Sequence, residues 1–343
     1  MVGAGFASGR EVAQFFAVFG PRSAAGIVIA TVLLGGLSLA TMTLASRHQA
    51  QDHGQLLSLL LPGALGHAAA LVIDMMTFQS LTVMLSGSAT ALSLTWQLDP
   101  EVTSALTALL ALGIAFRGHA AFMGINGWLG VLLCLGIFWV TSLPPAPSVQ
   151  ADIYMLPPSP GSPLSNWMVA AVLYAGYNFP TLGALFVSLR PGRRSSHRER
   201  HIGVVIGLSI IGYLLARGCT AIQEGGPAVL HSPMPFLLLA QMHPPGAVSP
   251  TALYAAILWL AMFSTALANL LVLRARLQQW FHRRQLVLVL LALLTFCSWM
   301  LADVGFASLV GWGYPAFGII GMAMPVAVVI TGGVRRRSRS IRG

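Results

Sequence analysis

The chain has 343 residues, of which 56% are hydrophobic and only 8% are charged, and its mean hydropathy is +0.77. A water-soluble domain carries about a quarter charged residues, so this composition excludes soluble fold classes and predicts an all-α integral membrane protein. The net charge of +10 comes from arginines gathered in loops and in the C-terminal tail, which indicates membrane topology rather than nucleic-acid binding.

Apolar runs of about 20 residues predict ten membrane-spanning helices, the first of them shortened, in contact with the lipid bilayer. In chain order they lie near 2-19, 23-45, 65-95, 102-116, 120-142, 165-189, 202-222, 250-273, 285-302 and 309-332.

A proline-rich segment at 143-164 is expected to be an extended linker outside the cytoplasm. It separates a first half at 1-142, whose first helix is incomplete, from a second half at 165-332, and an arginine-rich tail follows at 333-343. Each half has five spans, so the second must be inverted relative to the first, and inverted five-helix halves recur in transporters.

Arginines occupy alternate connections between the predicted spans. Sixteen of the 19 fall on one side, whereas Asp99, Glu101, Asp152 and Glu224 fall on the other. Short cytoplasmic loops accumulate positive charge, so this distribution predicts a cytoplasmic C-terminus in a multi-pass protein of the inner (cytoplasmic) membrane. The apolar segment 227-245 contains five prolines and is expected to cover the outer vestibule without spanning the membrane.

Two sequences predict broken helices at matching places in the two halves. VGAGFASGRE places Gly3, Gly5 and Gly9 in the first helix, and LYAGYNFP places Pro180 in the middle of the sixth. Glycine weakens a helix and uncovers its backbone, and proline removes one helical hydrogen bond. A broken membrane helix presents amide groups that suit a carboxylate and carbonyls that suit a small cation.

These breaks predict a binding site for a small organic solute, an amino acid or a related compound. We expect the amides of Ala4 and Gly5 to bind an anionic group of the solute. The other candidate contacts lie in the sixth helix: Tyr174, Gly176, Tyr177 and Asn178.

Ser264 and Thr265 are neighbours in an otherwise apolar helix. Their hydroxyl groups have two interpretations. They can complete an oxygen cage for Na⁺ with carbonyls of the first helix, or they can bond back to carbonyls of their own helix one turn earlier, which is common in membrane helices.

Four stretches resemble the YkvI-type bacterial membrane proteins of the amino acid-polyamine-organocation (APC) superfamily, which has the LeuT-type fold. They are VGAGFASGREVAQFF at 2-16, VLYAGYN at 172-178, FSTALANLLVLRARL at 263-277 and VGFASLVGWGYPAFGIIGM at 304-322. The resemblance implies a ten-helix 5+5 inverted-repeat bundle that alternates between outward-open and inward-open states, as in a symporter. It also implies a Na⁺ site formed by Ser264, Thr265 and the carbonyl of Val2. No other metal and no cofactor are expected, because the sequence contains no HExxH, no DPGN and no paired Cys/His spacing.

In that family a further half-helix precedes the glycine motif, whereas here Met1 directly precedes Val2. We therefore expect the true start codon to lie upstream of Met1.

Charges inside predicted spans are costly, so they indicate function or specific pairing. Glu11 matches an acidic position of the family motif and is a candidate gate or proton-coupling group. For Asp74 two roles stay open: proton coupling and a structural hydrogen bond. Arg217 and Glu224, seven residues apart, are expected to pair at the outer surface.

Transport of a small organic solute coupled to Na⁺ is therefore the predicted function. The alternatives are a proton-coupled permease and a transporter-like sensor or partner subunit that binds a ligand without moving it. An enzyme is not expected, because no histidine lies at mid-membrane depth to act as a base for GFASG. The sequence does not indicate the oligomeric state.

Overall fold

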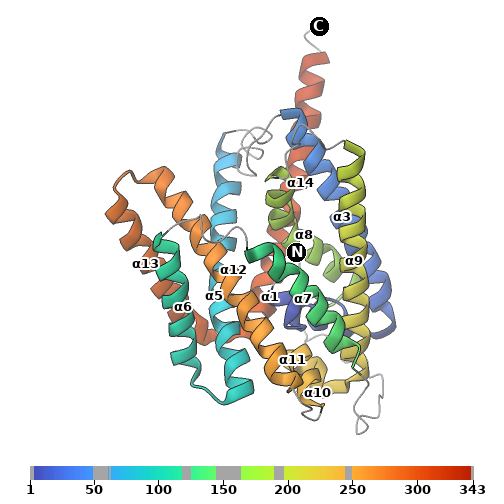
Figure 1. The fold of residues 1–343 in the computed structure, drawn as a ribbon. Helices are drawn as coiled ribbons and strands as arrows, with labels where there is room; N and C mark the ends of the chain where they lie inside the picture. Colours follow the sequence, from blue (N-terminus) through green and yellow to red (C-terminus); the bar gives the residue numbers. More distant parts are fainter. Residues whose placement is uncertain are drawn as a thin grey trace.

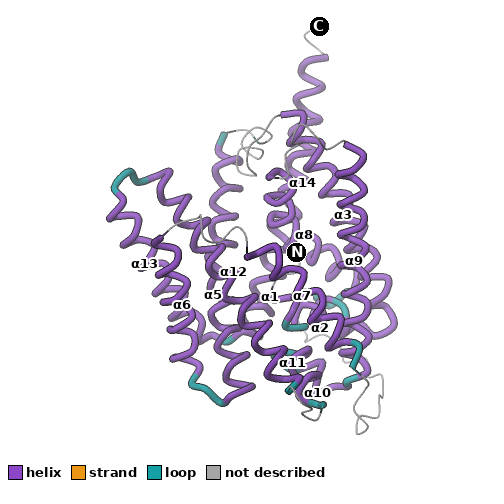
Figure 2. Tube along the Cα trace, viewed as in Figure 1, coloured by secondary structure: helices purple, strands orange, loops and turns teal. Residues whose placement is uncertain are grey.

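The computed structural model describes residues 4–48, 61, 63–117, 125–143, 164–188, 197–243 and 249–340. All regular elements in these ranges are helices, as Figure 2 shows. Within the same ranges, seven helices are long and apolar enough to cross a membrane, and a shorter apolar helix covers Trp128–Thr141. The predicted class, an all-helical multi-pass integral membrane protein, is confirmed.

Nine long helices account for most of the described residues. They are α3 (Ser23–His48), α5 (Ala64–Trp96), α6 (Pro100–Arg117), α7 (Ile125–Thr141), α8 (Trp167–Ser188), α9 (His197–Glu224), α12 (Pro250–Trp280), α13 (Arg284–Leu301) and α14 (Phe306–Ser340). The short elements are α1 (Ala4–Ala7), α2 (Arg10–Phe15), α10 (Gly226–His231), α11 (Pro235–Gln241) and the 3₁₀ helices η1 (Ala17–Arg22) and η3 (Ala302–Val304).

Local sequence explains where several helices begin. The side chain of Asp99 accepts hydrogen bonds from the amides of Glu101 and Val102, so it caps the start of α6. In the same way Ser249 accepts a hydrogen bond from the amide of Ala252 at the start of α12. Both helices have proline at their first position, where the missing N–H costs nothing.

The end of α12 corrects one prediction. The helix continues to Trp280, about two turns beyond the expected end of the span. Arg274 and Arg276 therefore lie on the helix itself and not in a loop. From the extended part of α12, Arg274 donates a hydrogen bond to the carbonyl of Ala115 in α6.

The long helices form two groups, which Figure 1 shows side by side. In the first group α12 packs along α5 and α6, and α13 contacts the same three helices. In the second group α8 lies between α3 and α14, and α9 packs along α3. The short elements α1 and α2 lie at the junction, where they contact α5 and α12 of the first group and α8, α9 and α14 of the second.

The first helix is broken, as predicted, and the structure places the break at Ser8 and Gly9. Gly9 has φ 82° and ψ −8°, a left-handed conformation that side chains disfavour. A Cβ at this position would also lie 2.9 Å from the ring of Phe236. Glycine is therefore required here both by the backbone and by the close approach of α11.

The second predicted break is wrong, because α8 runs without interruption through Pro180. Pro180 cannot donate to the carbonyl of Gly176, but that carbonyl lies directly against Gly321 of α14, where no side chain intervenes. The carbonyl that loses its helical donor thus faces the backbone of α14 at close range.

The proline-containing segment after α9 does not span, as expected. It forms the two short helices α10 and α11. They lie at the end of the bundle opposite to the C-terminal end of α14 (Figure 1). Each begins beside a proline, and the two helices pack against each other and against α9.

Candidate functional site

Hydrogen bonds within the first helix satisfy backbone groups at its break. The hydroxyl of Ser8 donates to the carbonyl of Gly5 at 2.6 Å and accepts from the amide of Arg10 at 3.1 Å. The amide of Gly9 donates to the carbonyl of Phe6 at 3.0 Å. These bonds replace the helical ones that the turn at Gly9 removes.

Two other elements bind the remaining carbonyls of the break. The hydroxyl of Tyr254 in α12 donates to the carbonyl of Ala7 at 2.6 Å, and the amide of Phe236 in α11 donates to the carbonyl of Ser8 at 3.1 Å. The carbonyls of residues 5 to 8 therefore all have donors in this conformation. In this conformation α11 and α12 therefore hold the break in place.

Glu11 lies in the first turn after the break, and its side chain is only 3% exposed. A Cβ on Gly5 would collide with the carboxylate oxygen Oε1 of Glu11 and would lie 3.0 Å from the hydroxyl oxygen of Tyr314 in α14. The absence of a side chain at Gly5 thus allows α1, α2 and α14 to meet around one buried carboxyl group.

Aromatic rings of α8 pack against α14 and α2 near the break. The ring of Tyr177 in α8 stacks on that of Tyr314, with 4.0 Å between centroids and an interplanar angle of 16°. The ring of Tyr174, one turn earlier, is fully buried and makes edge contacts with Phe15 and Phe16. The hydroxyl oxygen of Tyr174 is buried without a hydrogen-bond partner.

The other two predicted contacts of α8 have structural roles. Asn178 donates to the carbonyl of Tyr174 at 3.0 Å, within its own helix. Gly176 faces α14, where a Cβ would collide with the carbonyl of Gly318 and would lie 2.5 Å from Cγ of Met322. The structure therefore brings Gly5 to the buried carboxyl group and stacks Tyr177 on Tyr314. It uses Asn178 for a backbone hydrogen bond and Gly176 for helix packing. The side chain of Ala4 lies outside the described residues.

Gln14 joins the broken helix to α14. Its side-chain amide donates to the carbonyl of Gly311 at 3.1 Å. That carbonyl lies four residues before Pro315, which has no N–H to offer it. Gln14 of α2 thus supplies the hydrogen-bond donor that Pro315 lacks. The side-chain oxygen of Gln14 is buried without a partner.

The predicted sodium ligands are only partly described. The hydroxyls of Ser264 and Thr265 both donate to the carbonyl of Ala261, at 3.0 and 2.8 Å. This is the back-bonded arrangement that the sequence left open. Each hydroxyl oxygen keeps lone pairs after donating its proton. Val2 lies outside the described residues.

Two intramembrane charges have partners on other helices. Asp74 of α5 forms an ion pair with Arg276 of α12 at 3.0 Å. In this conformation Asp74 therefore has a structural role. The predicted pair between Arg217 and Glu224 is wrong. Arg217 instead donates to the carbonyl of Thr141 at the end of α7, at 2.8 Å, and Glu224 is exposed.

Sequence reasoning missed Tyr314, Gln14 and Tyr254. Pro315 is a signal for one of them, since it predicts that the carbonyl of Gly311 needs a donor from elsewhere. Nothing in the spacing indicates which donor, because Gln14 and Gly311 are 297 residues apart.

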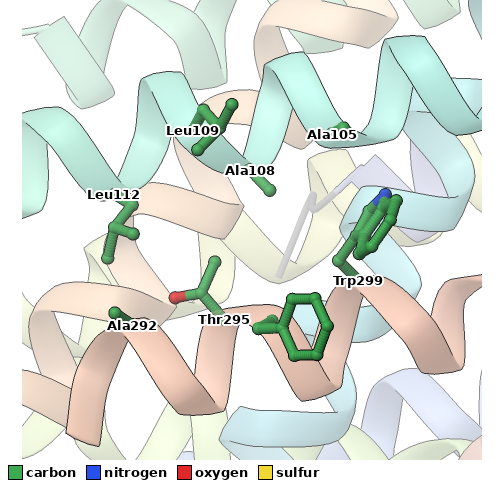
Figure 3. A pocket seen from close by; sticks show the side chains of 8 residues that line it. Ala105, Ala108, Leu109, Leu112, Ala292, Thr295 and Trp299 are labelled. Atoms are coloured by element: carbon green, nitrogen blue, oxygen red, sulfur yellow. The ribbon is translucent and has the colours of Figure 1, made fainter. Parts of the chain in front are cut away.

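A pocket of about 220 Å³ lies away from this site, between α6 and α13. Figure 3 shows Leu109 and Leu112 of α6 opposite Thr295 and Trp299 of α13. The hydroxyl of Thr295 bonds to its own helix, and Leu109 is 65% exposed. The pocket therefore opens on the surface of two apolar helices and offers a solute no polar group.

Comparisons with known proteins agree with the sequence resemblance. YkvI of Bacillus subtilis (strain 168), described as an uncharacterized membrane protein, is 23% identical over 344 residues, which cover 98% of this chain and 94% of YkvI. YyaD of the same strain is 24% identical over 342 residues, covering 96% and 93%. The chain is a distant homologue of YkvI. No family model matches the sequence.

Solved structures of a manganese transporter from Eremococcus coleocola are similar to this chain. A mutant form has a TM-score of 0.46 and 15% identity, covering 96% of this chain and 69% of that one. A complex of the same transporter with an aromatic bis-isothiourea compound has a TM-score of 0.44, also at 15% identity, with 96% and 72% covered.

Proposed function

We propose that the protein is a secondary active transporter of a small organic solute, an amino acid or a related compound, coupled to Na⁺. The observation that carries the proposal is the break at Ser8 and Gly9. It lies between the two helix groups and places the buried carboxyl group of Glu11 and the hydroxyl of Tyr314 on either side of Gly5. Broken helices at such a junction are where secondary transporters bind their substrates.

Alternating access requires one helix group to move relative to the other around the site. The hydrogen bonds from Tyr254 and Phe236 to the break close the site on the side of α10 and α11. On this side Arg10 also donates to the carbonyl of Ser232 at 3.3 Å. In the proposed cycle these bonds break when the site opens toward α10 and α11, and they form again when it closes.

The proposed substrate contacts are the amides of Ala4 and Gly5 with the side chains of Tyr174 and Tyr177. The proposed sodium ligands are Ser264, Thr265 and the carbonyl of Val2. The buried position of Ser264 on α12, which contacts α1, supports this assignment. In the predicted LeuT-type 5+5 arrangement, these residues belong to the first and eighth helices.

Thermal unfolding of the purified protein tests this proposal in Na⁺ and in K⁺ at equal ionic strength, with and without each amino acid. A ligand at 100 times its dissociation constant stabilises the folded state by about 2.7 kcal/mol. We expect a stabilisation specific to Na⁺ that a solute enlarges, and its loss in the double variant Ser264→Ala and Thr265→Val. The matched control is Ser209→Ala, since Ser209 is exposed and bonds back within α9.

A proton-coupled permease is the second candidate, and the burial of Glu11 favours it. Stabilisation by a solute without any effect of Na⁺ would support this candidate. No stabilisation by any solute or by Na⁺ would contradict transport and favour a sensor or partner subunit.

A further inference from the structure

We propose that the pocket between α6 and α13 holds one acyl chain of an anionic phospholipid, and that the phosphate of this lipid lies at Arg117 and Arg284. The lipid belongs to the leaflet at the end of the bundle where α6 ends and α13 begins. This site is separate from the broken helix and does not depend on the proposed transport function.

Small side chains open the pocket between the two helices. Figure 3 shows Ala108 of α6 opposite Ala292 and Thr295 of α13. The larger side chains of Leu109 and Phe296 are 65% and 53% exposed, so they line the pocket where it meets the surface. Both helices are long and apolar enough to cross a membrane. The pocket of about 220 Å³ therefore opens toward the hydrocarbon core of the bilayer.

The polar groups of the lining are already hydrogen-bonded. The hydroxyl of Thr295 donates to the carbonyl of Leu291 at 2.8 Å, and the indole N–H of Trp299 donates to the hydroxyl of Ser104 at 3.1 Å. The second bond joins the two helices and closes one end of the pocket. A water molecule needs two to four polar partners, and an empty apolar space forfeits dispersion contacts. An acyl chain from the surrounding bilayer suits this lining.

The other end of the pocket points toward exposed arginines. It is lined by Leu112 and Ala292. Arg117 lies five residues after Leu112, about 8 Å along α6, and Arg284 lies eight residues before Ala292, about 12 Å along α13. Both arginines are exposed, and Figure 1 shows the end of α6 and the start of α13 at the same end of the bundle.

The depth of the pocket matches one leaflet. Ala105 lines the closed end, and twelve residues of α6 separate it from Arg117, which is about 18 Å. Half of a hydrocarbon core of about 30 Å is about 15 Å. A chain whose headgroup lies at the arginines therefore reaches the closed end from its own leaflet.

The charge at this end suits an anionic headgroup. Arg283 is also exposed, and Arg274 of α12 donates to the carbonyl of Ala115 near the end of α6. In the described parts of α6, α12 and α13, the acidic residue is Glu101 at the opposite end of α6, and the carboxylate of Asp74 in α5 is already in an ion pair. Guanidinium groups bind phosphate through charge-assisted hydrogen bonds. A neutral lipid would leave this charge unmatched, and a phosphate without chains would leave the pocket empty.

Binding of defined lipids to the purified full chain in detergent micelles tests this inference by native mass spectrometry. The probes are dioleoylphosphatidylglycerol, dioleoylphosphatidylcholine with the same chains, and glycerol 3-phosphate without chains. We expect phosphatidylglycerol to bind at least tenfold more tightly than phosphatidylcholine, and glycerol 3-phosphate not to bind in the same concentration range. Phosphatidylglycerol should also raise the melting temperature.

Arginine variants test the headgroup. Arg117→Gln and Arg284→Gln should each weaken phosphatidylglycerol binding about fivefold, since one basic residue near an anionic lipid contributes about 1 kcal/mol, which equals this factor. Phosphatidylcholine binding should not change. Arg22→Gln is the matched control, because Arg22 is an exposed arginine of η1, which packs on α2, α3 and α9. It should leave the affinity for both lipids unchanged.

Pocket variants test the acyl chain. Ala108→Phe and Ala292→Phe place a ring in the pocket from opposite helices, so one of them serves if the other does not fold. Each should remove most of the phosphatidylglycerol binding. Gly113→Phe is the matched control, since it adds the same ring on α6 where a Cβ meets nothing within 4 Å. It should bind phosphatidylglycerol as the parent does.

Equal affinity for the two lipids, or unchanged phosphatidylglycerol binding in both arginine variants, would overturn the assignment of the headgroup. Unchanged binding in both pocket variants would overturn the assignment of the chain. Binding of glycerol 3-phosphate as tight as that of phosphatidylglycerol would show a phosphate site without an acyl chain. A dimer that both pocket variants convert to monomers would make a second copy of the chain the occupant, and would also overturn the inference.

Discussion

The two helix groups are held together by different kinds of contact. Side chains in the group of α5, α6, α12 and α13 form hydrogen bonds from one helix to the next. These bonds are Thr82 with Ser298 (2.9 Å), Asn269 with Ser80 (2.9 Å), Trp259 with Thr107 (3.2 Å), Trp299 with Ser104 (3.1 Å), and the ion pair of Asp74 with Arg276 (3.0 Å).

The group of α3, α8, α9 and α14 is packed through glycines. A Cβ on Gly318 of α14 would lie 2.5 Å from the carbonyl oxygen of Leu173 in α8, and Gly176 and Gly321 meet one turn further along. Between α9 and α3, Gly212 faces Thr31, with only 3.2 Å between a built Cβ and the threonine hydroxyl. The backbones of these helices therefore approach closely.

Directional hydrogen bonds fix one helix relative to another, whereas a smooth glycine surface fixes the distance between helices but resists sliding less. We therefore expect the first group to stay rigid during transport and the second group to move against it. The candidate site lies where the two kinds of packing meet. Four predictions test this difference, from the largest expected effect to the smallest.

Gly318→Ala should have the largest effect. The new methyl group meets backbone atoms of Leu173, which cannot rotate away, so α14 must move off α8. Overpacking costs about 1–3 kcal/mol and more where the obstacle is backbone. Thermal unfolding should show a clear loss of stability. Gly36→Ala on α3 is the matched control, because its Cβ meets nothing within 4 Å and alanine favours the helix. Equal melting of the two variants would contradict glycine packing.

Arg276→Gln should have the next largest effect, in the hydrogen-bonded group. It leaves Asp74 without its partner, and the two side chains are 30% and 17% exposed. Breaking a buried pair costs about 3–5 kcal/mol, and partial exposure lowers this to roughly 1–3 kcal/mol. Adding Asp74→Asn should recover part of the loss. A double variant as unstable as Arg276→Gln would mean that the pair does not hold α5 to α12.

Gln14→Leu tests the connection between the broken helix and α14. It removes the donor for the carbonyl of Gly311, and a buried carbonyl without a donor costs about 1–3 kcal/mol. Pro315→Ala should rescue it, because the new N–H can bond to the same carbonyl. Unfolding midpoints of the two single variants and the double variant give the answer. Additive losses would show that Gln14 does not act through this carbonyl.

The smallest effect is expected for Thr82→Val and Ser298→Ala, which remove one hydrogen bond between α5 and α13. Interhelical hydrogen bonds in membrane proteins contribute about 0.6 kcal/mol on average. A double-mutant cycle on unfolding free energies should give a coupling of about this size. A coupling near zero would show that this bond adds nothing to the rigidity of the first group.

The sequence predicted the spans well because hydrophobic length is a property of each segment alone. The break in the first helix was also predictable, since Gly9 adopts a conformation that other residues disfavour. Pro180 gave a misleading signal. The carbonyl of Gly176, which loses its helical donor at Pro180, faces Gly321, and no local pattern places these two glycines together. The extension of α12 to Trp280 likewise depends on the partners of Arg274 and Arg276.

The amino-acid sequence by itself therefore determined that this is a multi-pass helical membrane protein with a broken first helix. Composition and backbone preference act locally and survive any packing. Only the tertiary structure decided that Glu11 and Tyr314 meet at Gly5, that α8 stays continuous and that one helix group is hydrogen-bonded while the other is closely packed. These features join residues far apart in the chain, because the contacts that decide them exist only when the helices are packed together.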